Sequence, residues 1–282
     1  MKLSELLDLC RMEMAAAGCD APREAEILVS ALAGVPRSRL FLERDREAGD
    51  LSGALRSWIA RRAGGEPVQY ILGAWEFYGR EFLLTRDTLI PRPETEGLVE
   101  RVLGALRQRG REDGLLLDVG TGSGAIAVTL AAELPRARVA AVALSAEALR
   151  VAGKNARRHG VADRVFLLRG DAYSALKNGN RFDVVVSNPP YLTEGEWGSL
   201  PAEVRDFEPP GALLAGADGL SVLRVLVAEA GLHLVPGGEL WCEIGDMQGE
   251  AVKRLPSGPL RVVGVFPDLA GRDRAACWKK EC

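Results

Sequence analysis

The chain has 282 residues, of which 47% are hydrophobic, and its 36 basic and 39 acidic residues give a formal net charge of -3. This length and composition predict a soluble globular protein with one large domain and a small one, and the charge balance disfavours a dedicated nucleic-acid-binding protein. No segment reaches the roughly 18 consecutive apolar residues of a membrane span, and the acidic start of the chain does not resemble a signal peptide, so we expect a cytoplasmic location.

The cysteines and histidines do not indicate a metal site or a disulfide framework. The cysteines are odd in number and contain no C-x-x-C pair, which favours buried or incidental thiols. His233 has no carboxylate or cysteine at ligand spacing, and His159 follows a basic stretch at the expected end of a helix, so we expect both to be structural. The five cysteines are Cys10, Cys19, Cys242, Cys277 and Cys282.

The first sixty or so residues predict a small domain of short helices. Apolar residues recur at helical spacing over residues 4–17, and Pro22 opens a second helix over residues 24–32. Residues 51–62 predict a third helix.

Between residues 65 and 81 the helical pattern breaks into turn residues and aromatics. We interpret this stretch, with residues 82–85 and the proline-punctuated segment 89–93, as a hairpin that connects to the next domain and lies against it. The exact boundary lies between Arg62 and Glu94. The predicted parts are a helical N-terminal domain over residues 1–75, a linker hairpin over residues 76–94 and a larger domain over residues 95–282.

From residue 94 onward, apolar runs alternate with helical stretches. Such near-continuous apolar strands, separated by helices, indicate a parallel sheet covered on both faces. Two later runs, 260–266 and 275–280, predict a closing hairpin at the sheet edge. The expected fold class is α/β, with a seven-stranded, mostly parallel, Rossmann-like sheet. The other strand runs are 115–117, 139–144, 165–168, 184–186 and 240–244.

A glycine-rich turn follows the first strand of this sheet. Its glycines allow a sharp turn and a close approach to a ligand, which the amides of the next helix would face, so the turn predicts a nucleotide-type pocket; a turn without a ligand is the alternative. Gly120, Gly122 and Ala125 also match a dinucleotide fingerprint, but Asp118 favours a cationic methyl donor because a carboxylate would repel a pyrophosphate. The predicted cofactor residues here are Asp118, Gly120, Thr121, Gly122, Ser123 and Gly124.

The ends of the next two strands give weaker signals. Related folds end the second strand with an acid that binds the ribose hydroxyls, but the residue here is Ala143. Either Ser145 or Glu147 replaces that acid, or the nucleoside is held less tightly by about 1.5–3 kcal/mol, or Ala143 is simply strand core. After the third strand, Asp171 is placed to accept a hydrogen bond from an adenine amino group, although a solvated turn aspartate fits the spacing nearly as well.

The most informative motif is Asn188-Pro189-Pro190-Tyr191, which follows an apolar strand. Two prolines in succession present rigid carbonyl groups at the sheet edge where ligands bind. A planar amide or an exocyclic amine is a poor nucleophile, and the Asn188 side-chain oxygen and the Pro189 carbonyl could grip its two N–H bonds. Tyr191 could pack over the planar group. The motif predicts methyl transfer to such a nitrogen, with catalysis by orientation and acceptor dipoles rather than by a strong base.

These motifs resemble the HemK/PrmC family of protein-(glutamine-N5) methyltransferases, which modify peptide chain release factors. The resemblance covers nearly the whole chain from Gly65 to Arg274. Its most family-specific segment is Ile90-Pro91-Arg92-Pro93-Glu94-Thr95-Glu96, and Glu208-Pro209 and Glu243-Ile244-Gly245 with Gln248 also match.

The resemblance implies S-adenosylmethionine as the methyl donor and the glutamine of the release factor's Gly-Gly-Gln loop as the acceptor. It implies that Asn188, Pro189, Pro190 and Tyr191 hold the glutamine, that the helical N-terminal domain docks the release factor, and that the protein acts as a monomer. Two residues depart from the family pattern, because the ribose-binding acid falls on Ala143 and the bulky residue beside adenine falls on Ala172. The implied donor pocket comprises residues 120–124, Ala143, Asp171, Ala172 and Asn188.

Two other functions stay open. The Asn-Pro-Pro-Tyr motif also occurs in adenine-N6 methyltransferases, so a nucleic-acid methyltransferase acting on an adenine or guanine amino group is one alternative. It would require a flipped base and a basic groove, which the acidic balance disfavours. The other is a non-catalytic relative that has lost the donor, which Ala143 suggests and the intact acceptor motif disfavours.

Overall fold

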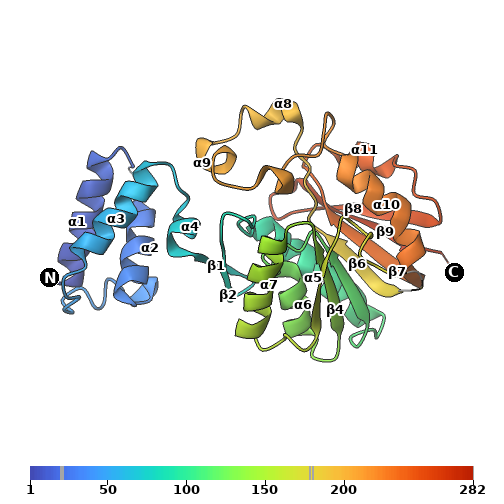
Figure 1. The fold of residues 1–282 in the computed structure, drawn as a ribbon, viewed down its shortest axis with the longest axis horizontal. Coiled ribbons are helices and arrows are strands. Elements are labelled where there is room, and N and C mark those ends of the chain that lie inside the picture. Colours follow the sequence, from blue (N-terminus) through green and yellow to red (C-terminus); the bar gives the residue numbers. More distant parts are fainter. Residues whose placement is uncertain (20–21, 178, 180, 282) are drawn as a thin grey trace. The chain divides into compact units, whose positions relative to one another are not determined.

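The computed structural model describes residues 1–19, 22–177, 179 and 181–281 (Figure 1). Its internal contacts divide the chain into two compact units. One unit comprises Met1–Ala74 with Pro201–Phe207, and the other comprises Trp75–Leu200 with Glu208–Cys282. The domain limits expected from the sequence stay predictions.

The first unit is helical. The three predicted helices are confirmed within a few residues as α1 (Leu3–Ala16), α2 (Pro22–Ala33) and α3 (Ser52–Ala63). The short helix α4 (Val68–Leu72) lies where only turns were predicted, so that prediction is wrong over these five residues. Five residues are too few to show a helical period; α4 begins after Pro67 and ends at Gly73, whose φ is 70°.

Within the region where a hairpin was expected, strands β1 (Ala74–Phe77) and β2 (Arg80–Leu83) form a two-stranded sheet. Tyr78 and Gly79 join them, with φ values of 53° and 67°, as a two-residue type I′ turn requires. Phe77 and Phe82 are buried in the core of the second unit.

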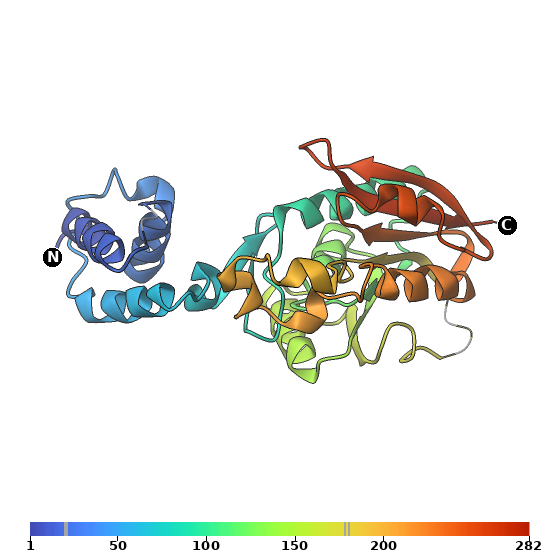
Figure 2. The same cartoon turned by 90° about the horizontal axis from the view of Figure 1, so that it is seen from above.

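The second unit is built on a seven-stranded sheet in the order β5-β4-β3-β6-β7-β9-β8. Figures 1 and 2 show this sheet with helices packed against it. The first five strands of that order run parallel, and β9 runs antiparallel to both β7 and β8. The predicted fold class and the closing hairpin are therefore confirmed. The strands are β3 (Leu115–Val119), β4 (Arg138–Ala143), β5 (Val165–Arg169), β6 (Phe182–Ser187), β7 (Leu234–Glu243), β8 (Leu260–Pro267) and β9 (Asp273–Lys280).

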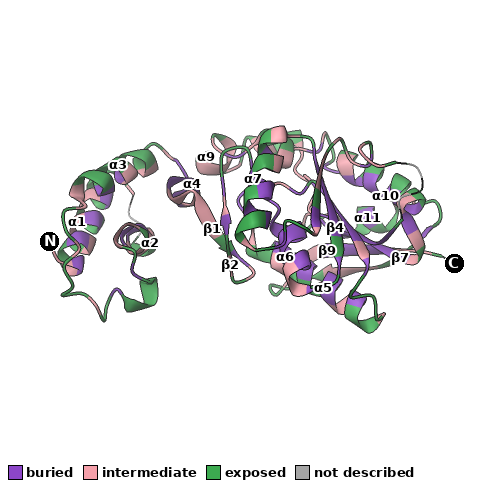
Figure 3. Cartoon of the chain, turned by 60° about the horizontal axis from the view of Figure 1, so that its bottom comes forward, coloured by how far each residue is buried: buried purple, intermediate pink, exposed green. Residues whose placement is uncertain are grey.

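Helices cover both faces of this sheet, and Figure 3 shows buried strands between more exposed helices. Successive side chains of a strand point to opposite faces, so Leu116 packs in one hydrophobic core with α5, α6 and α7, and Leu117 packs in the other with α10 and α11. Within the described part of the chain, no helix has both the length and the apolarity to cross a bilayer. The helices are α5 (Pro93–Gln108), α6 (Ala125–Glu133), α7 (Ala146–Arg158), α10 (Ser221–His233) and α11 (Gly249–Lys253).

The strand order creates a switch point between β3 and β6. From β3 the chain adds β4 and β5 on one side and then returns to add β6 and β7 on the other. In open α/β sheets, ligands bind at such a point, beyond the carboxyl ends of the strands. The glycine-rich turn after β3 and the Asn-Pro-Pro-Tyr motif after β6 therefore flank the expected ligand position.

Candidate active site

The glycine-rich turn is tied to the end of β4. The amides of Gly120 and Thr121 both donate to the carbonyl of Val142, at 2.9 Å each. Gly124 begins α6 with a φ of 81°, and a Cβ added there would lie 3.1 Å from the Cβ of Ala152. Glycine is therefore needed at this position both for its backbone angle and for the close packing of α6 on α7.

Asp118 lies at the end of β3 and is completely buried. One carboxylate oxygen accepts hydrogen bonds from the Thr121 hydroxyl (2.6 Å) and the Ala127 amide (3.1 Å). The other, Oδ1, has no partner among the described residues. Burial raises the pKa of Asp118 to about 7. A buried carboxylate oxygen without a partner needs an explanation, and a bound cation or N–H donor would supply one.

Asn155 of α7 holds the glycine-rich turn in place. This residue is fully buried, and its amide nitrogen donates to the carbonyls of Ser123 (2.8 Å) and Leu83 (3.0 Å). Its oxygen accepts from the Leu83 amide at 2.8 Å. One side chain thus joins the hairpin β1–β2 to the glycine-rich turn, a role that the sequence did not reveal.

The end of β4 lacks a polar side chain facing the expected ribose. Ala143 is buried, and the next residue, Leu144, is 69% exposed. Ser145 caps α7, accepting from the Ala148 amide at 3.1 Å, and Glu147 is exposed and pairs with Arg150. The hydroxyl of Ser145 is therefore already used by the helix terminus.

The turn after β5 places Asp171 at the surface of the same edge. Its amide donates to the Ser174 hydroxyl at 2.8 Å, and its side chain is exposed. Ala172 follows with a φ of 44°, which is unusual for a residue other than glycine. The structure thus brings Asp171 and Ala172 to the sheet edge that also carries Asp118 and Ala143.

The Asn-Pro-Pro-Tyr motif lies at the carboxyl end of β6. Ser187 donates to the carbonyl of Val119 at 2.7 Å and so locks the ends of β6 and β3 together. Asn188 and Tyr191 are half-buried. Gln248 donates to the carbonyls of Tyr191 and Gly219, at 3.1 Å each, which fixes the backbone after the two prolines.

Asn188 belongs to a chain of hydrogen bonds that leads into the buried interior. Its amide nitrogen donates to the Thr95 hydroxyl at 3.0 Å, and that hydroxyl donates to the Glu243 carboxylate at 2.6 Å. The Tyr191 hydroxyl approaches the other oxygen of Glu243 at 3.5 Å. Burial raises the pKa of Glu243 to about 7 and that of Tyr191 to about 12.

A small cavity of about 30 Å³ opens beside Asn188, Tyr191 and Glu243. Arg92 also lines it and forms an ion pair with the buried carboxylate of Glu208. Glu208 accepts a second hydrogen bond from the Ile90 amide at 3.2 Å. The Ile-Pro-Arg-Pro-Glu-Thr-Glu segment is thereby fixed against this cavity.

Sequence reasoning missed Thr95, Glu243, Arg92 and Glu208 as members of the site. All four belong to segments that carry the family resemblance, but no local sequence motif indicates a chemical role for them. Thr95 and Glu243 are separated by 148 residues, so their contact depends on the sheet order. The signal that could have indicated them is position, since Glu243 ends a strand at the ligand-binding edge.

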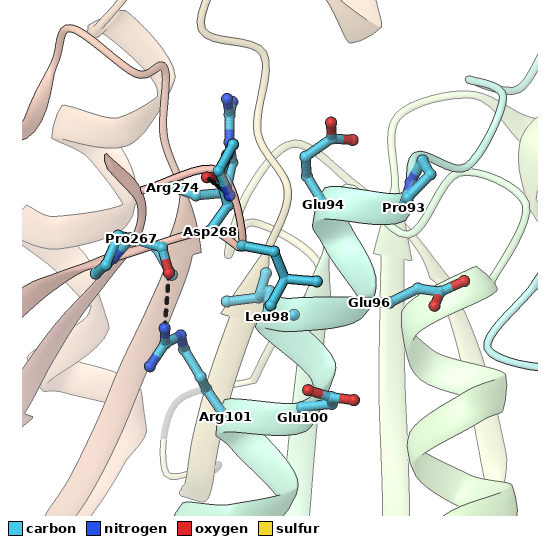
Figure 4. Close-up of a pocket in the computed structure, with 13 residues that line it drawn as sticks. Pro93, Glu94, Glu96, Leu98, Glu100, Arg101, Pro267, Asp268 and Arg274 are labelled. Carbon is cyan, nitrogen blue, oxygen red and sulfur yellow. Dashed lines mark hydrogen bonds and ion pairs between the residues drawn. The ribbon is translucent and has the colours of Figure 1, made fainter. Parts of the chain in front are cut away.

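A larger groove, of about 690 Å³, lies between α5 and the β8–β9 connection (Figure 4). Its lining comes from residues 93–101 and 267–275. Arg101 is held in it by a hydrogen bond to the Pro267 carbonyl at 2.8 Å. Of the site residues predicted from the sequence, none lines this groove.

The histidines and cysteines have structural surroundings. His159 lies 2.9 Å from the Glu81 carbonyl and packs on Phe82, and His233 stacks on Tyr173 at 4.8 Å. Cys10, Cys242 and Cys277 are buried, Cys19 is partly buried, and Cys282 lies outside the described residues. Among the residues that the structure describes, no group of three or more histidine, cysteine or acidic residues could hold a metal ion.

Known families and proteins match most of the chain. A family described as "PrmC N-terminal domain" matches residues 5–73, and one described as "Methyltransferase small domain" matches residues 99–200. A release factor glutamine methyltransferase from Nitratidesulfovibrio vulgaris is 45% identical, with 96% of this chain and 93% of that protein covered. One with the same name from Moorella thermoacetica is also 45% identical, with 97% of each chain covered.

Among solved structures, a methyltransferase from Pyrococcus furiosus has a similar fold. Its TM-score is 0.52 at 18% identity, and the match covers 82% of this chain and all of that protein. At this identity the likeness concerns the fold alone.

Proposed function

The chain belongs to the release factor glutamine methyltransferase family, and we propose that it transfers a methyl group from S-adenosylmethionine to the side-chain amide nitrogen (N5) of a glutamine in a peptide chain release factor. We assign the target to the Gly-Gly-Gln loop of that factor. The release factor follows from the family, and the observation that supports an amide nitrogen as the methyl acceptor is the orientation of Asn188, whose nitrogen is occupied by Thr95 and whose oxygen is left to accept a hydrogen bond.

The residues around the glycine-rich turn fit the methyl donor. The buried Oδ1 of Asp118, which lacks a partner among the described residues, would accept from the ammonium group of the donor. Gly120, Thr121, Gly122, Ser123 and Gly124 would present their backbone to it, and Ala143, Asp171 and Ala172 would lie along its nucleoside. S-adenosylmethionine supplies a methyl group already activated by its sulfonium. Ala143 offers no hydrogen bond to a ribose, so binding relies on the remaining contacts.

The acceptor residues would orient the substrate amide. A carboxamide nitrogen is weakly nucleophilic because its lone pair is delocalised, and its two N–H bonds need acceptors. The oxygen of Asn188 and the carbonyl of Pro189 would take these two bonds, Pro190 would keep the backbone rigid, and Tyr191 would cover the planar group. The same oxygens would stabilise the positive charge that develops on nitrogen during transfer.

Several finer assignments belong to this proposal. The helical domain over residues 1–75 would dock the release factor, with residues 76–94 linking it to the methyltransferase domain over residues 95–282. The protein would act in the cytoplasm as a monomer, in translation termination and without a nucleic-acid substrate. The net charge of -3 supports the last point, because a polyanion would be weakly repelled.

The test is a methylation assay with labelled S-adenosylmethionine. Purified protein is incubated separately with a recombinant release factor and with a pool of duplex DNA and RNA, and the methyl group is mapped by mass spectrometry. Label on the glutamine of the Gly-Gly-Gln loop is the expected result. Label on nucleic acid alone would assign the protein to the amino-group methyltransferases of nucleic acids, and no label on either would contradict the proposal.

A further inference from the structure

We propose that Thr95 and Glu243 are positioning residues that fix which end of the Asn188 side-chain amide faces the methyl acceptor. This inference rests on the function proposed above. It assigns roles to two residues that no local sequence motif indicates. Thr95 comes from the first turn of α5 and Glu243 from the last position of β7. Their side chains meet behind Asn188, which follows β6.

The argument starts from what each group can donate. An ionised carboxylate only accepts hydrogen bonds, and a threonine hydroxyl has one hydrogen to give. The 2.6 Å contact therefore commits the Thr95 hydrogen to Glu243. Toward Asn188 the Thr95 hydroxyl can therefore act only as an acceptor, so the NH₂ end of the Asn188 amide must face it. The distance from the Asn188 nitrogen to the Thr95 oxygen is 3.0 Å. The oxygen of Asn188 must point the other way.

Burial makes this arrangement strict. Thr95 is 4% exposed and Glu243 is 1% exposed, so the Thr95 hydroxyl and the Glu243 carboxylate bond to each other and not to bulk water. A free asparagine could turn its amide by half a rotation at little cost, since oxygen and nitrogen are similar in size. Here the turned amide would place its oxygen next to the Thr95 oxygen, and two acceptors without a hydrogen between them repel each other. The pair thus selects the one orientation that offers an acceptor to a substrate N–H.

The direction of the hydrogen bonds depends on the protonation of Glu243. If the carboxyl gains a proton, it can donate to Thr95, and Thr95 can then donate to the oxygen of Asn188. The amide would turn and present N–H groups to a substrate that also brings N–H groups. The charged or titratable groups that face Glu243 are Arg274 from β9, Glu94 from α5 and Tyr191 after β6. Arg274 lowers and Glu94 raises the pKa of Glu243, which burial brings to about 7.

The first experiment compares Thr95→Val with Thr95→Ser in the full-length protein, using a recombinant release factor as substrate. Valine keeps the shape of threonine but removes the hydroxyl that links Glu243 to Asn188, the link called the relay below. Serine keeps this hydroxyl. We expect Thr95→Val to lower kcat by roughly 10- to 100-fold, as loss of one buried hydrogen-bonded orientation implies, with the Kd for S-adenosylmethionine within about threefold. Thr95→Ser should stay within about threefold of the wild type in kcat. Equal kcat values for the two variants would overturn the proposal.

The second experiment is a pH profile, which a merely structural role would not change. Because only the ionised Glu243 gives the productive orientation, kcat of the wild type should rise with pH, with the midpoint of the rise near 7. Thr95→Val breaks the relay, so its lower kcat should not follow this rise. Glu243→Gln cannot ionise and should also lose the rise. A variant that keeps the wild-type profile would overturn the proposal.

A third readout does not depend on turnover, and so separates failure of this inference from failure of the proposed function. The side-chain NH₂ signal of Asn188 can be assigned in ¹⁵N-labelled protein by its loss in Asn188→Ser. We expect this signal to shift with pH in the wild type and not in Thr95→Val. If the wild type methylates no glutamine, the proposed function fails, and this signal still tests the relay. An Asn188 signal that titrates equally in both proteins would contradict the relay.

Discussion

The Thr95 hydroxyl and the Glu243 carboxylate are 148 residues apart in the chain and are joined by a hydrogen bond of 2.6 Å. Pro93 at the first position of α5 suits a helix start because its fixed φ is already helical, and it places Thr95 in the first turn. Glu243 ends β7, which pairs with β6 on one side. The acceptor site is therefore assembled from three segments that meet at one sheet edge.

Replacing Asn188 with alanine should abolish turnover while leaving cofactor binding nearly intact. The substitution removes an acceptor that acts on the substrate nitrogen, whereas the donor is expected to bind mainly at the turn after β3. We expect the Kd for S-adenosylmethionine, measured by calorimetry, to stay within about tenfold of the wild type while kcat falls below detection. Thr193→Ala, which removes the cap of a short helix nearby, is the control and should keep near-normal kcat. An Asn188→Ala protein with near-normal kcat would refute the orientation mechanism.

Binding of S-adenosylmethionine should tighten as pH rises from 6 to 8. The pKa of Asp118 is raised by burial from 3.8 to about 7, so the carboxyl is largely neutral at pH 6 and largely ionised at pH 8. Only the ionised form attracts the cationic donor, and one titrating group can change affinity by at most about tenfold per pH unit below its pKa. Calorimetry at several pH values measures this. Asp118→Asn should bind more weakly at pH 8 and lose the pH dependence; an equally steep dependence in that variant would place the titrating group elsewhere.

Much of this fold follows from sequence patterns that repeat within one element. The apolar runs of β3 to β7 and the turn at residues 118–124 are local, so periodicity and glycine spacing were enough to find them. The helix α4 was missed because five residues cannot display a helical period. The contacts of Thr95, Glu208 and Asn155 were missed for a different reason: each joins segments that only the strand order brings together, and no local pattern carries that information.

Asn155→Ala should destabilise the second unit and weaken cofactor binding together. The side chain makes three hydrogen bonds in a fully buried position, to Ser123 and to both backbone groups of Leu83. The alanine variant leaves these backbone groups without partners. Each unpaired buried group destabilises the folded state by about 1–3 kcal/mol if the surrounding structure does not adjust. We expect the free energy of unfolding, measured with urea, to fall by about 2–4 kcal/mol.

Ser145→Ala is the matched comparison for Asn155→Ala. It removes the cap of the same helix, costs about 1 kcal/mol and leaves Ser123 untouched. If both variants weaken S-adenosylmethionine binding equally, Asn155 has no special role in holding the turn.

Ala143→Asp should improve cofactor binding, which makes it a gain-of-function test of the donor pocket. Ala143 ends β4 directly beside the turn, because the amides of Gly120 and Thr121 bind the carbonyl of the preceding residue. A carboxylate there would accept hydrogen bonds from the ribose hydroxyls. One charge-assisted hydrogen bond contributes about 1.5–3 kcal/mol, so the Kd for S-adenosylmethionine should fall by roughly one to two decades.

Ala143→Asn separates the charge of that carboxylate from its shape. Asparagine also reaches the ribose but forms a neutral hydrogen bond, contributing about 0.5–1.5 kcal/mol, so it should give the smaller gain in affinity.

The free energy of unfolding without ligand should fall slightly in Ala143→Asp, because Ala143 is only 6% exposed and a carboxylate there loses part of its hydration. If calorimetry shows Ala143→Asp binding no better than the wild type while the protein stays folded, the nucleoside does not lie along β4, and the placement of the donor must be revised.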